Sequence, residues 1–281
     1  MPQALCLLHA NCQGEALRIL LENSPAFARH FTVRHCVNYT KEELAEDDLK
    51  KCSLFLYQPL APKWGNISTE QILPRLPRSC QPIEIPNLFF KGYWPFWSSS
   101  PPINFGDSLL ETLLEKGLTP QEALNVYLRA GPALMGDVEA VAEESLQREE
   151  QKQAASPINC AALLRERWRH EQLFITVNHP GRTLLFHVAD SLLRLLGLGE
   201  LPQNVRRDYV HPLEDFWLPI HPATGSALGL PFATADRRYA VYRTSLTHAQ
   251  YTGCYLACRS HNISDLVTFL ENLLPGQHLY A

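Results

Sequence analysis

The chain has 281 residues, of which 46% are hydrophobic and 19% charged, and its formal net charge is −4. Such a chain can bury a large core, which excludes a disordered protein, and its acidic balance excludes a general attraction to nucleic acid or anionic membranes. No apolar run approaches the ~20 residues of a membrane helix, and residues 1–3 lead into a strand-like run rather than a signal peptide. We expect a globular cytoplasmic protein with no nucleic-acid partner and no transmembrane segment; its oligomeric state stays open.

The first informative stretch lies near the N-terminus. The apolar run at residues 5–10 ends in Asn11, Cys12 and Gln13, and a helical hydrophobic period follows Gly14. In an open parallel α/β sheet, ligands bind outside the carboxyl ends of the strands, and the next helix points its free N–H groups at the same place. A helix N-terminus lowers a thiol pKa and can hold an oxyanion, so Cys12 is the candidate nucleophile. The alternative is an inert buried filler, but the flanking amides favour the functional interpretation.

The remaining cysteines do not form a framework. Eight cysteines in a chain of this length are too sparse for a disulfide scaffold, and without an export signal we expect reduced thiols. Cys254 and Cys258 are four residues apart, but no second pair completes a zinc set. We therefore predict core positions for these two cysteines and no metal site.

Strands and helices alternate over the first hundred residues. After the first helix we expect strands at residues 31–37, 53–57 and 83–85, a helix from Thr40 to about Lys51 with a capping box at its start, and a short helix at 68–73. This alternation predicts a mainly parallel, doubly wound α/β sheet with right-handed crossovers. The polar residues that follow the strands would then share one edge: Asn11-Cys12-Gln13, Asn38-Tyr39, Gln58 and Asn87.

An aromatic stretch follows at residues 88–97 and ends in a Ser/Pro loop at 98–102. Two interpretations are equally supported. The stretch could be a buried strand and its exit, or Tyr93, Trp94 and Trp97 could form a surface on which a flat ring or a sugar packs.

From residue 107 the pattern becomes helical. We expect helices at 109–116, from Pro120, at 137–153 and at 160–170. The glutamates of the third of these helices predict a solvated face, and the fourth carries a basic cluster of Arg165, Arg167 and Arg169. We expect three segments packed as one domain around the sheet: an N-terminal β/α half at 1–105, a helical insertion at 106–172, and a C-terminal part at 173–281.

The second informative stretch repeats the geometry of the first. A strand-like run at 173–177 ends in Asn178-His179-Pro180, and an amphipathic helix follows at 184–196. If this strand lies beside the first strand in one parallel sheet, the imidazole of His179 reaches Cys12 and can activate its thiol. His211, His221 and His248 are alternatives from a loop-rich C-terminal flank, which ends in a predicted helix at 263–274.

Four motifs in the same order resemble the WcbI-like family of polysaccharide biosynthesis proteins, over about the first two hundred residues. They are Asn11-Cys12-Gln13, Gln58-Pro59-Leu60, the run from Ile85 through Asn87 and Lys91 to Tyr93, and Asn178-His179-Pro180. The resemblance implies a CoA-binding acetyltransferase of capsular polysaccharide synthesis, with an architecture like that of the SGNH hydrolases and a nucleophile after the first strand. The family often has Gly-Tyr-His-Pro where this chain has Trp94, which moves a base role to His179.

We therefore expect acetyl-CoA as acyl donor and a sugar or polysaccharide precursor as acceptor. Cys12, His179, Asn11 and Gln13 would be catalytic, with His179 as general base on Cys12 or on the sugar hydroxyl and the two amides stabilising the oxyanion. The expected CoA-binding residues are Gln58, Asn87, Lys91, Tyr93, Asn178 and Arg182, with the arginines at 165–169 as alternatives for the phosphates. The competing hypotheses are a thioesterase or carbohydrate deacetylase on the same scaffold, and a non-catalytic glycan- or nucleotide-binding protein.

Overall fold

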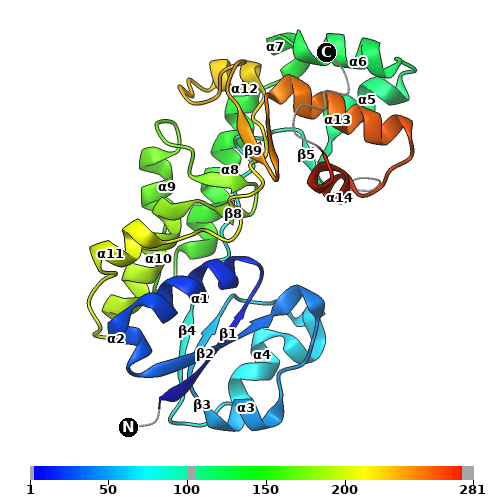
Figure 1. The fold of residues 1–281 in the computed structure, drawn as a ribbon. Coiled ribbons are helices and arrows are strands. Elements are labelled where there is room, and N and C mark those ends of the chain that lie inside the picture. The colour runs from blue at the N-terminus through cyan, green and yellow to red at the C-terminus, as the bar shows by residue number, and fades with distance from the viewer. Residues whose placement is uncertain (1–2, 100–104, 274–281) are drawn as a thin grey trace. The chain divides into compact units, whose positions relative to one another are not determined.

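The computed structural model describes residues 3–99 and 105–273, and it divides into two compact units (Figure 1). Unit 1 comprises residues 1–89, 148–165 and 178–212, and unit 2 comprises 90–147, 166–177 and 213–281. These boundaries differ from those of the three segments expected from the sequence, because stretches that are distant along the chain pack into the same unit. Each unit is described by itself.

Unit 1 is built on a four-stranded sheet in which every neighbouring pair is parallel. The strand order is β2-β1-β3-β4, with β1 (Ala4–Ala10), β2 (Phe31–Val37), β3 (Cys52–Tyr57) and β4 (Gln81–Glu84). Residues 6–10 of β1 are all buried, as expected for a strand covered on both faces. The predicted α/β class, the parallel sheet and its four strands are confirmed.

Helices cover both faces of this sheet (Figure 1). On one face α1 (Gln13–Asn23) packs against α10 (Arg182–Leu195). On the other, α3 (Glu46–Lys51) and α4 (Thr69–Ile72) enclose a core with side chains of β1 and β3. The remaining elements of the unit are α2 (Pro25–Ala28), α11 (Gln203–Asp208), β8 (His179–Pro180) and the 3-10 turns η1 (Asn38–Thr40), η2 (Pro62–Ile67) and η3 (Leu73–Arg75).

The helix predicted from Thr40 begins later than expected, at Glu46. Thr40 donates its hydroxyl to the carbonyl of Val37 at 2.8 Å and so belongs to the 3-10 turn. Lys41 then adopts a left-handed conformation with φ 59°, which interrupts the helix. The capping-box pattern at Thr40 therefore predicted the start of this helix wrongly.

Unit 2 contains several of the helices predicted after residue 107. α5 (Ser108–Glu115) begins one residue before the predicted helix and has Asp107 as its N-cap, and α6 (Pro120–Leu128) begins at Pro120 as predicted, after its N-cap Thr119. α8 (Val138–Gln153) and α9 (Ala161–Arg167) each contribute to both units. The other elements are α7 (Pro132–Met135), α12 (Pro222–Ala227), α13 (His248–Ser260), α14 (Leu266–Glu271), β5 (Trp97–Ser98), β6 (Gly106–Asp107), β7 (Phe174–Thr176), β9 (Tyr239–Val241) and β10 (Thr244–Leu246).

Three expectations for this part of the chain need correction or completion. β7 belongs to unit 2 and is not a strand of the four-stranded sheet, so the expected side-by-side pairing with β1 is wrong. The aromatic stretch at 88–97 is irregular up to β5. α13 was not foreseen, and it buries Cys254 and Cys258 as the sequence predicted for them. The Ser/Pro loop from position 100 and the end of the predicted 263–274 helix lie outside the described residues.

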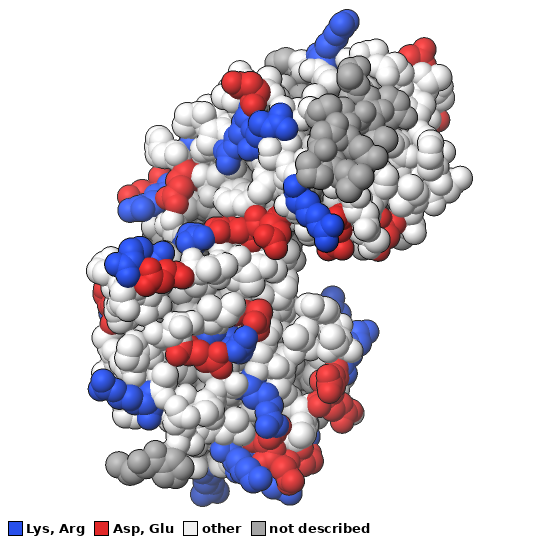
Figure 2. Space-filling view, viewed as in Figure 1, with Lys and Arg blue, Asp and Glu red and all other residues white. Residues whose placement is uncertain are grey.

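Charges are mixed on the surface. On the face shown in Figure 2, basic and acidic side chains lie next to one another rather than in large fields of one sign. Ion pairs such as Arg18–Glu15 and Arg194–Glu200, both at 2.6 Å, are part of this pattern. Within the described ranges, no helix is both long and apolar enough to cross a membrane.

Gly14 allows the turn between β1 and α1 to pack closely against β2. A Cβ atom at this position would lie 2.3 Å from Nε2 of His35 and 2.9 Å from Cβ of Ala10. The position therefore requires glycine for close approach, since both neighbours are held by the sheet.

We expect Gly14→Ala to lower the free energy of unfolding by about 1–3 kcal/mol through overpacking, although alanine is the better helix former. Denaturant unfolding of the purified variant measures this change. Gly131→Ala is the matched control, because a Cβ at that position meets no atom within 4 Å. Equal stability of the two variants would show that the turn is not tightly packed.

Candidate functional site

The two predicted catalytic side chains meet in unit 1. Cys12 is the N-cap residue of α1, and His179 opens β8. Nε2 of His179 lies 3.2 Å from Sγ of Cys12, and both residues are half-buried. The sequence therefore placed the pair correctly, although the strand before His179 is not the neighbour of β1.

Burial decides the protonation of this pair. It raises the pKa of the Cys12 thiol above its ordinary value, while the backbone N–H groups of Cys12 and Gln13 act in the opposite direction and do not outweigh it. This corrects the expectation that the helix end favours the thiolate. Burial also lowers the pKa of His179 to about 4, with a smaller contribution from His211. At neutral pH the site therefore holds a thiol against a neutral imidazole.

Gln13 is a positioning residue in this structure. Its Nε2 donates to the carbonyls of Leu88 and Asn178, both at 2.8 Å. Its Oε1 accepts from the backbone N–H of Leu88 at 3.1 Å and from the amide of Gln58 at 3.3 Å. Because both amide hydrogens are engaged and the side chain is only 5% exposed, Gln13 does not fit the expected role of an oxyanion donor.

Asn11 and Gln58 complete this amide network. Gln58 is 1% exposed, accepts from the backbone N–H of Asn11 at 2.9 Å, and donates to the carbonyl of Pro86 at 3.2 Å. Asn11 accepts from the N–H of Gln13 at 2.9 Å and donates to Oδ1 of Asn87 at 3.2 Å. The residues after β1, β3 and β4 thus share one sheet edge as predicted, and Gln58 contacts protein groups rather than a surface open to CoA.

Two residues that support the site were missed. Lys152 donates to the carbonyl of Asn87 and pairs with Glu149, which is 2% exposed and also accepts from the N–H of Phe89. Together, these contacts of Lys152 and Glu149 hold the loop that carries Asn87 in place. Glu149 stands among the glutamates expected on a solvated face, and the spacing of charges along the helix gave no signal of its burial.

The predicted CoA-binding residues fall in both units. Asn87, Asn178 and Arg182 belong to unit 1, where Arg182 donates to the carbonyl of Tyr209 at 2.7 Å. Lys91 and Tyr93 belong to unit 2. Tyr93 is fully buried, and its hydroxyl donates to the carbonyl of Trp168 at 2.6 Å. The arginines at 165–169 each pair with a glutamate, namely Glu150, Glu171 and Glu139.

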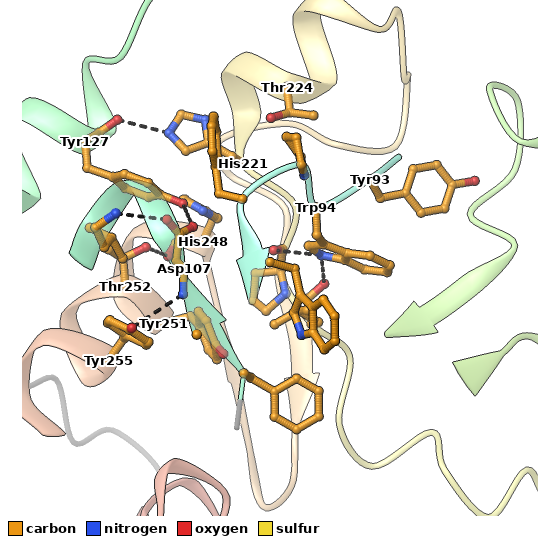
Figure 3. A pocket seen from close by; sticks show the side chains of 18 residues that line it. Tyr93, Trp94, Asp107, Tyr127, His221, Thr224, His248, Tyr251, Thr252 and Tyr255 are labelled. Atoms are coloured by element: carbon orange, nitrogen blue, oxygen red, sulfur yellow. Dashed lines mark hydrogen bonds between the residues drawn. The ribbon is translucent and has the colours of Figure 1, made fainter. Parts of the chain in front are cut away.

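The alternative histidines occupy other positions. His211 is buried beside the Cys12–His179 pair, with Nε2 3.0 Å from the carbonyl of Pro180. His221 and His248 lie in unit 2, where their ring centroids are 4.7 Å apart (Figure 3). His179 is therefore the histidine in contact with Cys12.

Comparison with known proteins agrees with this fold and with the sequence motifs. A family model described as the polysaccharide biosynthesis enzyme WcbI matches residues 5–201. The chain belongs to the WcbI family of polysaccharide biosynthesis enzymes. A solved WcbI structure is similar over 97% of this chain and 91% of that one, with a TM-score of 0.75 and 17% identity. It is described as the native protein of a novel polysaccharide biosynthesis enzyme, without a disulfide bond between CoA and one of its cysteines. No curated protein matches the chain.

The lowered pKa of His179 predicts a pH-dependent loss of stability. Below its unfolded pKa near 6.5 the unfolded chain binds a proton that the folded chain refuses until the pH reaches about 4, so stability falls as the pH drops through this window. We expect His179→Gln to remove up to about 3 kcal/mol of the stability difference between pH 7 and pH 4. Denaturant unfolding across this range measures it.

The control is His30→Gln, which replaces an exposed histidine of the same unit. A His179→Gln variant that keeps the full pH dependence of the parent would contradict a buried neutral imidazole.

Proposed function

We propose that this enzyme transfers an acetyl group from acetyl-CoA to a hydroxyl group of a sugar or polysaccharide precursor, with Cys12 as nucleophile and His179 as general base. The main observation in support of this proposal is the 3.2 Å contact between Cys12 Sγ and His179 Nε2, with the imidazole neutral at pH 7. Family membership supports a role in polysaccharide biosynthesis. The similar structure is named as one without a disulfide bond between CoA and a cysteine, and this association of CoA with a cysteine of that protein supports CoA as the donor here.

In the first half-reaction the sulfur of Cys12 attacks the thioester carbonyl as its proton moves to Nε2 of His179. The backbone N–H of Cys12 and the side-chain amide of Asn11 are our candidates for oxyanion donors, since Asn11 gives only one of its two amide hydrogens to Asn87. When the tetrahedral intermediate collapses, the bond between the carbonyl carbon and the sulfur of CoA breaks, and His179 returns the proton to the departing thiolate. Cys12 then carries the acetyl group as a thioester.

In the second half-reaction the neutral His179 takes the proton of the sugar hydroxyl as its oxygen attacks acetyl-Cys12. The carbon–sulfur bond breaks, an acetyl ester forms on the sugar, and the imidazolium protonates the Cys12 thiolate. The resting thiol and neutral imidazole are thereby restored. A direct transfer in which His179 activates the hydroxyl without the thioester is the alternative that the experiment below separates.

The donor's phosphates need cations or N–H groups. We propose Arg182 at the N-terminus of α10, with Asn87 and Asn178 nearby in the same unit, as contacts to CoA. Tyr93 and Gln58 are both buried, so each would contribute through packing within its own unit rather than by contact with CoA. An SGNH-hydrolase-like architecture, a cytoplasmic location and a role in capsule synthesis belong to the same proposal.

We expect incubation with acetyl-CoA to add one acetyl group to Cys12, detected by peptide mass spectrometry, and Cys12→Ala to abolish both this adduct and transfer to sugar. His179→Gln should lower turnover by about 10²- to 10⁴-fold, the usual contribution of a general base, with little change in CoA affinity.

Cys36→Ala and His30→Gln are the matched controls, since both residues lie in the same unit outside the site. Transfer that survives in Cys12→Ala would favour the direct route. Release of acetate without transfer would favour the thioesterase or deacetylase, and CoA or glycan binding without any turnover would favour the non-catalytic hypothesis.

A further inference from the structure

Two buried cysteines of unit 1 lie with their sulfur atoms in contact. Cys52 begins β3, and Cys80 is the residue before β4. The thiol of Cys80 donates to Sγ of Cys52 over 3.5 Å, and the thiol of Cys52 donates to the carbonyl of Leu54 at 3.1 Å. Cys52 is 2% exposed and Cys80 is 8% exposed, and both thiols are free in this structure.

The contact lies at the amino edge of the sheet in unit 1. β3 and β4 are parallel neighbours, and their pairing begins with Leu54 opposite Gln81, just after the two cysteines. Cys12 follows the carboxyl end of β1 and so belongs to the opposite edge. A bond between the two sulfurs would therefore join segments that the sheet already holds side by side, without a change in strand pairing.

The two sulfur atoms are close enough to form a disulfide bond. That bond is about 2.05 Å long, so the atoms need to approach each other by about 1.5 Å, which small rotations about both Cα–Cβ bonds supply. Cys254 and Cys258 of α13 differ in this respect, because Cβ atoms four residues apart on a helix are about 5–6 Å from each other. A disulfide needs a Cβ–Cβ distance of about 3.5–4.5 Å, which that helix does not provide.

Two other roles are common for buried cysteines. Most are small apolar fillers, and Cys52 and Cys80 do belong to a core cluster with Leu7, Leu49 and Phe55. A filler does not need its thiol to touch a second thiol, however. Paired thiols can also be half of a zinc site, but within the described ranges no three His, Cys, Asp or Glu residues are grouped to hold a metal ion. The sulfur–sulfur contact therefore favours a bond between the two residues.

We propose that Cys52 and Cys80 form a reversible disulfide bond when the protein reacts with hydrogen peroxide, independently of the acyl transfer proposed above. The sulfur of Cys52 attacks one peroxide oxygen, the O–O bond breaks, and the thiol proton leaves with the other oxygen as water. The sulfur of Cys80 then attacks the sulfenic acid on Cys52, and the S–O bond breaks with release of a second water. The two thiols lose two electrons and two protons, and the peroxide is reduced to two waters.

Burial determines the rate of this oxidation and the kind of oxidant. It raises the pKa of both thiols, that of Cys80 to about 12, so little thiolate is present at neutral pH and the reaction is slow. The hydrogen bond from Cys80 acts on the pKa of Cys52 in the opposite direction, which makes Cys52 the attacking sulfur. Peroxide is small enough to reach a buried atom, whereas glutathione disulfide would have to place its own sulfur in line with it.

The bond would stabilise the part of the sheet that supports the site. It closes the segment from residue 52 to residue 80, which restricts the unfolded chain. This segment contains Gln58, whose side chain accepts from the backbone N–H of Asn11 at 2.9 Å. Oxidation at the amino edge would therefore strengthen the scaffold while leaving the residues at the carboxyl edge chemically unchanged.

Peptide mass spectrometry of the folded full-length protein after treatment with hydrogen peroxide tests the proposal. The Cys12→Ala variant is used, so that the half-buried thiol of residue 12 consumes no peroxide. The peroxide is removed with catalase, and the protein is then unfolded in iodoacetamide to block the remaining thiols. We expect a linked pair of peptides that joins residues 52 and 80, has two hydrogen atoms fewer than the reduced peptides, and separates in dithiothreitol. Cys254 and Cys258 are the internal control and should be recovered as alkylated thiols.

Thermal unfolding of the same samples is the second measurement. Oxidation should raise the melting temperature by roughly 5–10 °C, and dithiothreitol should reverse the increase. Adding either Cys52→Ala or Cys80→Ala to the Cys12→Ala background should abolish the increase, and testing both ensures that one unstable variant does not decide the result.

Three results would overturn the proposal. The first is recovery of residues 52 and 80 as separate thiols or sulfinic acids at a peroxide concentration that fully oxidises free cysteine. The second is a bond from either residue to another cysteine, or a bond between Cys254 and Cys258 that forms equally fast. The third is an increase in melting temperature that persists when Cys52 or Cys80 is replaced by alanine.

Discussion

The site in unit 1 depends on one buried side-chain amide, that of Gln13. It links the turn between β1 and α1 to the loop after β4 through Leu88, and to the segment that carries His179 through the carbonyl of Asn178. A glutamate would place its oxygen against two carbonyl oxygens, and an asparagine would be too short by one methylene group. Gln13 therefore sets the distance between Cys12 and His179. Its own side-chain hydrogen bonds go to neither the thiol nor the imidazole.

Burial sets the chemistry of the pair that this network positions. A solvated cysteine and histidine side by side form a thiolate and an imidazolium when the two pKa values cross, whereas here burial moves each group toward its neutral form. In the proposed mechanism, the thiolate of Cys12 therefore forms only when a substrate carbonyl accepts the sulfur's electrons and the proton moves to His179 at the same time. A resting thiol also reacts more slowly with oxidants and stray electrophiles than a thiolate does.

Features that depend on local sequence patterns were predicted correctly. The four strands of the sheet, the start of α6, and the positions of Cys12 and His179 on turns after apolar runs all followed from periodicity and turn residues. It could not predict which strands pair, because β7 has the pattern of a sheet strand and lies in unit 2. The burial of Glu149 and the direction of the Cys12 pKa shift were also out of reach, because both depend on groups brought together from distant parts of the chain. For the same reason the positioning role of Gln13 became visible only with its partners in place.

The most direct test of a neutral Cys12–His179 pair is an ultraviolet titration of the Cys12 thiolate, taken as the absorbance difference between the protein and its Cys12→Ala variant. The account predicts no thiolate absorbance at neutral pH and an increase only above the ordinary pKa of a cysteine. A thiolate signal that persists down to pH 5 and disappears in His179→Gln would show an ion pair instead, and would contradict the account.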